Sequence, residues 1–368
     1  MALSTRLGAL RRLDWSLFIA TVLLVIIGLA ALYSVTINVE NPDYSRVLRQ
    51  VIFAGIGIVA LFAFALIDYR VWWSTSWALY LLGAGLLAAV LLFGETIRGT
   101  TGWFTILGQT FQPVELIRII FILHLSRFFA HRSDGQNPIR TLVESGLLVA
   151  VYVVLLILQP EFGYTALLLG VWLVFVLLAR IPRRYLVLLG IGAVLAGAFI
   201  WLFVLQGYQK DRLQTFFNPS SDRLGRSYNV TQSIVAIGSG RWFGRGLGLG
   251  PQSQLNFLPE QSTDFIFAVI AEELGFLGAV LVISIFSVVF IRLFRAVGRS
   301  TDSYSALLLT GILLLVFGQM FINIGMNLGL LPVTGIPLPF ISYGGSALLT
   351  NCVMIGIAQS VIMRQPKS

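Results

Sequence analysis

Long runs of apolar residues, separated by short polar segments, form the dominant pattern of this sequence. A helix needs about 20 predominantly apolar residues to cross the hydrocarbon core of a bilayer. Runs of that kind lie at residues 15–35, 48–67, 73–93, 112–130, 142–158, 162–179, 185–206, 264–291, 305–329 and 343–363. The pattern therefore predicts an all-α, polytopic integral membrane protein with ten transmembrane helices. A large outer loop, residues 207–263, would lie between the seventh and eighth spans. No linker or repeat divides the chain, so we expect a single domain, 1–368.

The composition agrees with this fold class and excludes several kinds of site. Hydrophobic residues make up 57% of the chain and charged residues only 11%, whereas soluble domains carry roughly 25% charged residues. One cysteine, Cys352, allows no internal disulfide. Two histidines, His124 and His131, are too few for a histidine-built metal site.

The basic residues are distributed unevenly between the two sides of the predicted membrane protein. If both termini are cytoplasmic, fifteen lysines and arginines lie in inner segments, and the short outer segments hold only Arg46, Arg49 and Arg98. Positive charge in short loops marks the cytoplasmic side, so we expect both termini there. The large outer loop holds further basic residues, Lys210 and Arg212 among them. Because that cluster would face outside the cell, the net charge of +9 does not indicate nucleic-acid binding.

Asp264 lies at the junction between the large loop and the eighth apolar run. A carboxylate at the edge of an apolar span costs free energy, which favours a function, although an aspartate also caps a helix start well. Counting outward from Arg292 at the rise of an α-helix puts Glu272 near the outer hydrocarbon edge. Asp264 would lie about 12 Å further out, at headgroup depth, if the helix continues. Glu273 would point away from Asp264 around the helix, which predicts a structural role for it.

Two outer segments, residues 238–250 and 330–346, contain too many glycines and prolines for plain connectors. Glycine permits tight turns and a close approach of backbone to a ligand. Flexible surface turns are the alternative interpretation. Irregular backbone at membrane depth persists only where it is buried in protein or faces a wet cavity.

Polar residues gather at the outer ends of the fourth and fifth spans. Glu115 and Arg118 are three residues apart, so they can pair on one face of a helix. This pair either binds substrate or satisfies itself inside the bundle. Glu161 ends the fifth span after a proline. In the large loop, Lys210 and Arg212 suit a diphosphate or an anionic lipid headgroup, although a solvated basic loop explains part of that cluster.

Six stretches of the chain carry a resemblance to one family. They are Phe111–Glu115, Gln159–Gly163, Arg212–Pro219, Gln232–Gly240, Leu258–Gly275 and Asn323–Ser346. Together with the number of spans, they resemble the shape, elongation, division and sporulation (SEDS) family of bacterial cell-wall polymerases over the whole chain. Residues 331–345 resemble the elongation type rather than the division type.

The resemblance implies a peptidoglycan glycosyltransferase of the bacterial cytoplasmic membrane. It would polymerise lipid II, the undecaprenyl-diphosphate-linked disaccharide-pentapeptide, on the outer face during cell elongation. The family's essential aspartate matches Asp264, and its conserved glutamate on the fourth span matches Glu115. Two positions depart from the family pattern: a lysine is replaced by Arg118 and an aspartate by Glu161. Further candidate substrate-binding residues within the matching stretches are Thr263, Ser342 and Tyr343.

The family's donor sugar is α-linked and its product bond is β, which implies one inverting displacement without a covalent enzyme intermediate. Such a step needs a base for the acceptor 4-hydroxyl, a role that we assign to Asp264. A free aspartate has a pKa near ~3.9, so apolar surroundings would have to raise it. Alternatively, Asp264 helps to hold a divalent cation, Mg²⁺ or Mn²⁺, together with substrate phosphates. Arg212 would stabilise the departing diphosphate.

Two rival functions use the same features. Charged residues inside a bundle also mark transport paths, as a lipid II flippase would require. A ligase that attaches lipid-linked glycans to another acceptor is the third interpretation. The resemblance also implies a class B penicillin-binding protein, a transpeptidase, as partner, beside membrane lipids and the undecaprenyl-diphosphate-linked glycan.

Overall fold

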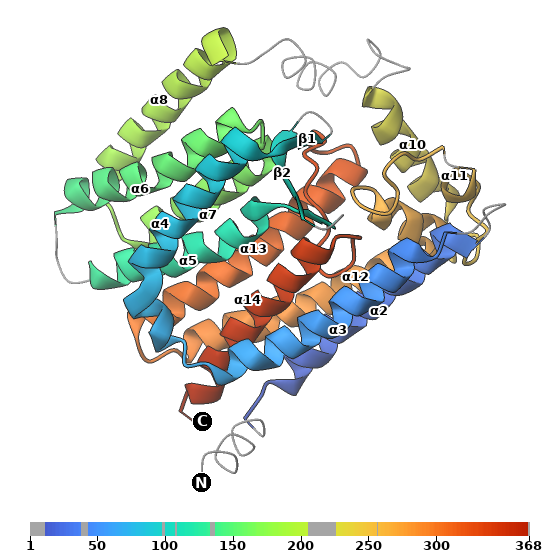
Figure 1. The fold of residues 1–368 in the computed structure, drawn as a ribbon, viewed down its shortest axis with the longest axis horizontal. Coiled ribbons are helices and arrows are strands. Elements are labelled where there is room, and N and C mark those ends of the chain that lie inside the picture. The colour runs from blue at the N-terminus through green and yellow to red at the C-terminus, as the bar shows by residue number, and fades with distance from the viewer. Residues whose placement is uncertain are drawn as a thin grey trace.

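The computed structural model describes residues 12–37, 43–97, 100–106, 109–132, 137–204, 226–255 and 257–366. Within these ranges the chain is mostly helical, and most of its ten long helices lie side by side in a bundle (Figure 1). They are α2 (Trp15–Ile37), α3 (Ser45–Leu66), α4 (Arg70–Phe93), α5 (Pro113–His131), α6 (Pro138–Leu158), α7 (Phe162–Leu178), α8 (Arg183–Phe199), α12 (Ile266–Gly298), α13 (Ser303–Asn327) and α14 (Gly345–Arg364). A π-helical turn, η1 (Ile200–Val204), continues α8.

A helix overlaps each of the ten predicted spans. Among the described residues, seven helices are long and apolar enough to cross a membrane: α2, α3, α4, α6, α12, α13 and α14. Helix α7 is apolar but shorter. These helices support a multi-pass membrane protein, and the number of ten crossings stays a prediction.

The structure has a small sheet between the third and fourth spans, which the all-α prediction did not include. Three strands, β1 (Glu95–Ile97), β2 (Thr100–Ile106) and β3 (Gln109–Phe111), form an antiparallel sheet in that order. Strand β2 reads Thr-Thr-Gly-Trp-Phe-Thr-Ile, and β-branched and aromatic residues of this kind favour a pleated, half-buried surface. The pattern of apolar runs marks this segment only as a connector, although its local propensity is that of a strand.

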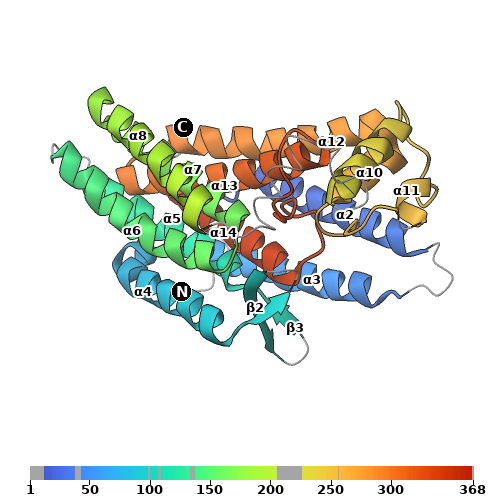
Figure 2. The ribbon, with the colours of Figure 1, turned by 90° about the horizontal axis from the view of Figure 1, so that it is seen from above.

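The segment predicted as one large loop also contains helices. Helix α10 (Arg226–Ser239) and the single turn α11 (Pro251–Gln254) lie within it. Both views place them beside the start of α12 (Figures 1 and 2). The predicted loop therefore includes folded structure that packs on the bundle.

The bundle has two ends, each marked by contacts between distant parts of the chain. At the Arg292 end, Arg292 pairs with Asp14 at 2.7 Å, next to the start of α2. Arg364, the last residue of α14, pairs with Asp68 at 3.4 Å at the same end. At the Asp264 end, α12 begins. The described segments nearest to the two termini therefore lie together, as the prediction of a shared side requires.

Close contacts between α3 and α14 depend on small residues. A Cβ at Gly356 would lie 2.5 Å from the carbonyl oxygen of Leu61, and one at Gly57 would lie 2.9 Å from Cys352 Sγ. Small residues allow helix backbones to approach in a membrane, where packing rather than the hydrophobic effect drives association. The thiol of Cys352 is buried in this contact, as its place in an apolar run predicts.

Candidate functional site

Asp264 lies in a tight turn immediately before α12. The helix begins at Ile266 with Phe265 as its N-cap, so the predicted span began two residues too early. The backbone N–H of Asp264 donates to the carbonyl of Glu260 at 3.1 Å. The Asp264 residue is half-buried, neither sealed in packing nor fully exposed. Its backbone is therefore held by a hydrogen bond, and part of the residue remains exposed.

Two asparagines of α13 hold the backbone of Asp264. Asn323 Nδ2 and Asn327 Nδ2 both donate to the Asp264 carbonyl oxygen, at 3.0 and 2.9 Å. Both asparagines are fully buried. The sequence analysis missed them, although their signal is visible: two amides one turn apart in an apolar span are costly unless they bond across helices.

The second glycine- and proline-rich segment packs directly against this turn. Ser342 Oγ donates to the carbonyl of Thr263 at 2.6 Å, and the Tyr343 N–H donates to the carbonyl of Ser262 at 2.9 Å. Gly335, with φ +75°, lies so near that a Cβ there would be 4.0 Å from Asp264 Oδ2. The structure therefore brings together Thr263, Ser342, Tyr343 and Asp264, which the sequence analysis named separately.

The same segment connects Asp264 with the start of α7. Asn323 Nδ2 donates to the Ile336 carbonyl at 2.9 Å. On its other side, the Ile336 side chain lies against Gly163, where an added Cβ would be 3.0 Å from Ile336 Cγ1. Residues 330–344 are thus irregular backbone packed between helices and largely buried from Ile336 to Ser342. Burial in protein is the setting in which such backbone persists in membranes.

Glu115 and Arg118 form the ion pair that their spacing predicts. The Arg118 guanidinium bonds the Glu115 carboxylate, and the two side chains are 0% and 1% exposed. The Tyr164 hydroxyl of α7 also donates to Glu115, and the Arg118 guanidinium lies 5.6 Å from the Tyr164 ring centroid. Arg118 Nη1 has no hydrogen-bond partner among the described residues. The pair is buried and largely satisfied by its own neighbours.

Glu161 lies close to this pair, at the N-cap of α7. Its carboxylate accepts a hydrogen bond from Gln112 Nε2 at 2.8 Å. Strand β2 passes over it, because a Cβ on Gly102 would lie 2.9 Å from Glu161 Oε1. The sheet therefore covers the ends of α5 and α7 where these acidic residues lie.

The first glycine-rich segment fills a break in α12. Gly275 has φ +69° and ψ −163°, so the helix is interrupted there rather than continuous as predicted. The N–H groups of Arg245 and Gly246 donate to the carbonyls of Glu272 and Glu273, at 2.9 and 3.0 Å. These glycines thus allow a close approach of the segment to the backbone of α12, and the approach to a ligand stays a prediction.

The two glutamates at this break have structural partners. Glu272 accepts from the backbone N–H groups of Gln252 and Ser253, at 2.8 and 3.0 Å. Glu273 accepts from Ser34 Oγ at 2.6 Å and from the Gly248 N–H at 3.1 Å. These contacts support the structural role predicted for Glu273.

Two candidate residues, Lys210 and Arg212, lie outside the described residues. The described part of the chain contains no group of three or more His, Cys, Asp or Glu side chains that could hold a metal ion. A divalent cation at Asp264 would therefore need substrate oxygens or water to complete its ligands. Among acidic groups, Glu260 is the one most closely connected with the Asp264 turn, since Thr263 Oγ1 donates to its Oε2 at 3.2 Å.

Comparison with known proteins gives consistent matches over nearly the whole chain. Peptidoglycan glycosyltransferase MrdB of Escherichia coli K12 is 35% identical, with 93% of this chain and 92% of the relative covered. Probable peptidoglycan glycosyltransferase FtsW of Thiomicrospira cyclica is also 35% identical, covering 95% and 91%. Stage V sporulation protein E of Bacillus subtilis is 34% identical, covering 95% and 96%.

Solved structures agree with these sequence matches. A chain of a peptidoglycan synthase complex, described as coordinating polymerization and crosslinking, has a TM-score of 0.81 at 28% identity and covers 95% of this chain and 97% of its own. The Thermus thermophilus rod shape determining protein RodA has a TM-score of 0.72 at 27% identity, covering 97% and 98%. The family profile FTSW/RODA/SPOVE, described as cell cycle protein, matches residues 14–367, and the chain therefore belongs to this SEDS family.

Proposed function

We propose that this protein is a peptidoglycan glycosyltransferase that extends glycan strands from lipid II during cell elongation. Family membership and the names of the relatives support the activity. One structural observation favours Asp264 as its centre: two buried asparagines fix the backbone of a half-buried aspartate. A positioned acid on a rigid element is what general acid–base chemistry needs.

The elongation type is supported by residues 331–345 and by the similarity to RodA. The orientation rests on the distribution of charge, which assigns the Arg292 end to the cytoplasm and the Asp264 end to the outside. Lipid-linked sugars would then meet Asp264 at the outer surface of the cytoplasmic membrane, with their tails between helices.

In the proposed reaction, the acceptor 4-hydroxyl oxygen attacks the anomeric carbon of the donor sugar. The bond from that carbon to the diphosphate oxygen breaks, and the configuration inverts. Asp264 accepts the hydroxyl proton, and the lipid diphosphate leaves with the bonding electrons. Arg212 and Lys210 neutralise the charge that develops on the diphosphate.

The remaining candidates fall into two groups. Glu161, Thr263, Ser342 and Tyr343 are proposed substrate-binding residues. Glu115 and Arg118 satisfy each other, so we propose that they act on substrate by positioning α5 against α7 rather than by direct contact. Arg118 Nη1 is the atom of the pair that remains available to a ligand or a water molecule.

A divalent cation, Mg²⁺ or Mn²⁺, is a second proposal for the same carboxylate. Bound there, it would supply charge neutralisation at the substrate phosphates. Asp264 is the protein ligand in this proposal, and Glu260 is the nearest further oxygen donor on its turn. Polymerisation that persists in excess chelator would exclude the cation and leave Asp264 as the base.

The similarity to a chain of a peptidoglycan synthase complex supports a class B penicillin-binding protein as partner. That partner would supply the transpeptidase. Membrane lipids surround the helices, and nucleic acid is not a proposed ligand.

The decisive experiment measures polymerisation of lipid II by the purified protein in detergent. We expect product from the wild type and none from Asp264→Asn, whose melting temperature should match the wild type. Asp43→Asn is the matched control, because Asp43 is an exposed aspartate that contacts Ser45 ahead of α3. It should retain full activity.

The rival functions give different outcomes in this assay. A flippase makes no polymer in detergent, where no barrier exists, and a ligase transfers single glycans only to its own acceptor. Full polymerisation by Asp264→Asn would overturn the assignment of Asp264 and leave the enzyme class intact.

A further inference from the structure

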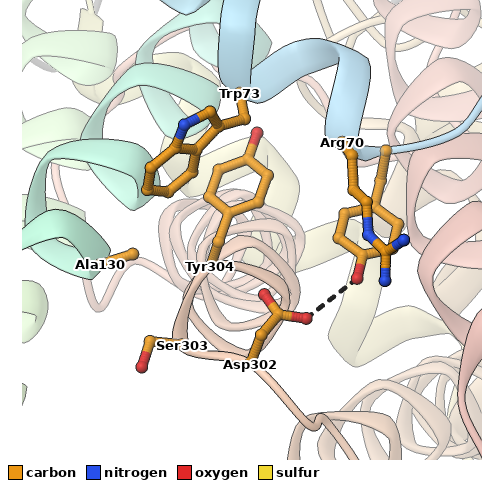
Figure 3. A pocket seen from close by; sticks show the side chains of 7 residues that line it. Arg70, Trp73, Ala130, Asp302, Ser303 and Tyr304 are labelled. Carbon is orange, nitrogen blue, oxygen red and sulfur yellow. Dashed lines mark hydrogen bonds between the residues drawn. The ribbon is translucent and has the colours of Figure 1, made fainter.

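A cavity of about 750 Å³ lies between α4, α5 and α6 at the Arg292 end, far along the helices from Asp264. Trp73 lines both this cavity and a smaller one of about 450 Å³ (Figure 3). In the smaller cavity, the Tyr69 hydroxyl donates to Asp302 at 2.9 Å. This contact places the smaller cavity near the turn between α12 and α13. The larger cavity has the size of a site for a substantial organic ligand.

His124 projects into the larger cavity without its full set of hydrogen bonds. The residue is 3% exposed, and its ring lies 4.4 Å from the Trp77 ring and 4.6 Å from the Tyr80 ring, centroid to centroid. The Ser76 backbone lies close by, but neither ring nitrogen forms a hydrogen bond of normal geometry with the described residues. Even if the Ser76 backbone is counted as a partner of one ring nitrogen, the other ring nitrogen of His124 has none among the described residues. A buried polar atom of this kind implies a ligand or water as partner.

The mouth of the cavity carries an excess of positive charge. Arg127 donates to Ser76 Oγ at 2.9 Å and lies 5.6 Å from the Trp73 ring centroid, and it pairs with no carboxylate in the described part of the chain. Arg132 pairs with Glu144, but its Nη1 is buried without a partner. Glu144 also pairs with Arg140 at 2.6 Å, so one carboxylate is shared by two guanidiniums.

Polarity falls along the cavity wall toward the bilayer. Helix α6 contributes Glu144 near the Arg292 end and Val151 about 10 Å further along the helix. Leu147 and Val151 line the cavity and are 65% and 43% exposed on the bundle surface, where lipid would cover them. A cationic mouth that continues into an apolar wall open to the membrane matches an anionic headgroup with an attached acyl chain.

We propose that this cavity is a binding site for an anionic phospholipid from the adjacent leaflet, which the charge distribution assigns to the cytoplasmic side. The phosphate lies against Arg127 and Arg132 Nη1, and His124 donates to a phosphate or ester oxygen. One acyl chain follows Leu147 and Val151 along α6. The site is separate from the proposed polymerase centre and does not depend on it.

The test is native mass spectrometry of the full-length, delipidated protein titrated with phosphatidylglycerol. We expect Arg127→Gln to weaken binding about tenfold, because a charge-assisted hydrogen bond is lost. His124→Phe keeps the aromatic packing and should weaken binding about threefold to tenfold. Arg299→Gln removes an equal charge from an exposed position at the same end, outside this cavity, and should leave binding unchanged. Melting curves check that each variant is folded.

The other ligands separate the possible occupants. Phosphatidylcholine should bind at least tenfold more weakly than phosphatidylglycerol, and inorganic phosphate should not compete at equal concentration. Competition by inorganic phosphate would identify a soluble anion and overturn the lipid assignment. If Arg299→Gln weakened phosphatidylglycerol binding as much as Arg127→Gln, the binding would depend on general surface charge and not on this cavity, and the proposal would fail. Retention of no lipid at all would leave only water in the cavity, and the proposal would fail.

Discussion

Asn323 and Asn327 both donate to the Asp264 carbonyl, so either one can hold it alone. Replacing both should therefore reduce stability and activity by more than the sum of the two single replacements. Replacing Asn323 by leucine removes the donor to the Ile336 carbonyl but leaves Asn327 bonded to Asp264. Replacing Asn327 by leucine leaves Asn323 bonded to Asp264. Only the double replacement removes both side-chain donors from the Asp264 carbonyl.

The size of each effect follows from which buried group loses its partner. A side-chain hydrogen bond inside a membrane protein is worth about 0.6 kcal/mol on average, and an orphaned buried carbonyl costs about 1–3 kcal/mol. Asn323→Leu leaves the Ile336 carbonyl without its side-chain donor and should lower the free energy of unfolding by about 1–3 kcal/mol. Asn327→Leu should lower it by about 1 kcal/mol. The double variant should exceed the sum by a further ~1–3 kcal/mol, which is the cost at Asp264.

Activity should follow the same non-additive pattern. A displacement of about 1 Å at a catalytic group costs on the order of 100-fold in rate. We therefore expect each single variant to retain at least about a tenth of the wild-type rate and the double variant to lose about 100-fold. The assay is lipid II polymerisation in detergent at temperatures where all variants are folded, with unfolding followed in parallel.

Asn351→Leu is the matched control. Asn351 is a buried asparagine of α14 whose Oδ1 has no partner among the described residues. Its replacement should therefore leave fewer buried polar groups without a partner than replacement of Asn323 does. It should leave activity near that of the wild type. Strictly additive losses in the double variant, in both stability and rate, would refute the idea that Asn323 and Asn327 substitute for each other at Asp264.

Two further predictions concern other parts of the fold. Gly244→Ala should lower the free energy of unfolding by at least about 2 kcal/mol, because φ is +81° there and the new Cβ would overlap the Glu273 carbonyl. Gly238→Ala should raise it by about 0.5–1 kcal/mol, because the backbone there is helical and the space around it is open. Thermal melting of the two variants checks both. Asp302→Ala should cost about 1–2 kcal/mol by removing the N-cap of α13, which accepts from the Ser305 N–H at 2.8 Å. Burial acts to raise the pKa of Asp302, but hydrogen bonds from Ser305 and Tyr69 hold it below its usual value. Its contribution should therefore be complete above about pH 3.9 and be lost as pH falls through the lowered pKa, so that wild-type and Asp302→Ala melting curves converge in acid.

The sequence was most informative where a periodic or compositional signal is local. A helix overlaps each apolar run, and the spacing of Glu115 and Arg118 predicted their ion pair correctly. The break at Gly275 was missed because an apolar run with glycine is compatible with a continuous membrane helix. The break is caused by a tertiary contact: the Phe276 N–H donates to the Arg241 carbonyl at 2.8 Å. Arg241 lies in the glycine-rich segment before α12, and the pattern of apolar residues does not reveal that this segment packs against α12.

The site itself was predictable only in part, for the same reason. Asp264 could be found at the junction of loop and span, but its supports come from α13 and from residues 330–344, whose contacts depend on the fold. The candidate residues on that segment, Ser342 and Tyr343, bond to the Asp264 turn through Ser342 Oγ and the Tyr343 N–H. A sequence pattern does not indicate which backbone group a side chain will meet.

Residues 330–344 connect the parts of the Asp264 end, and this explains their composition. Gln50 of α3 bonds this segment twice, through the Ser342 carbonyl and the Gly344 N–H, both at 3.2 Å. Together with Asn323 and the Asp264 turn, these contacts tie α3, α12 and α13 to one piece of irregular backbone. Such a segment must satisfy its polar groups without a helix and must turn sharply, as Gly335 and Phe340 do at φ +75° and +64°. Rigid irregular backbone thus holds the backbone of Asp264 in place, because any movement of that turn would break hydrogen bonds to several helices at once.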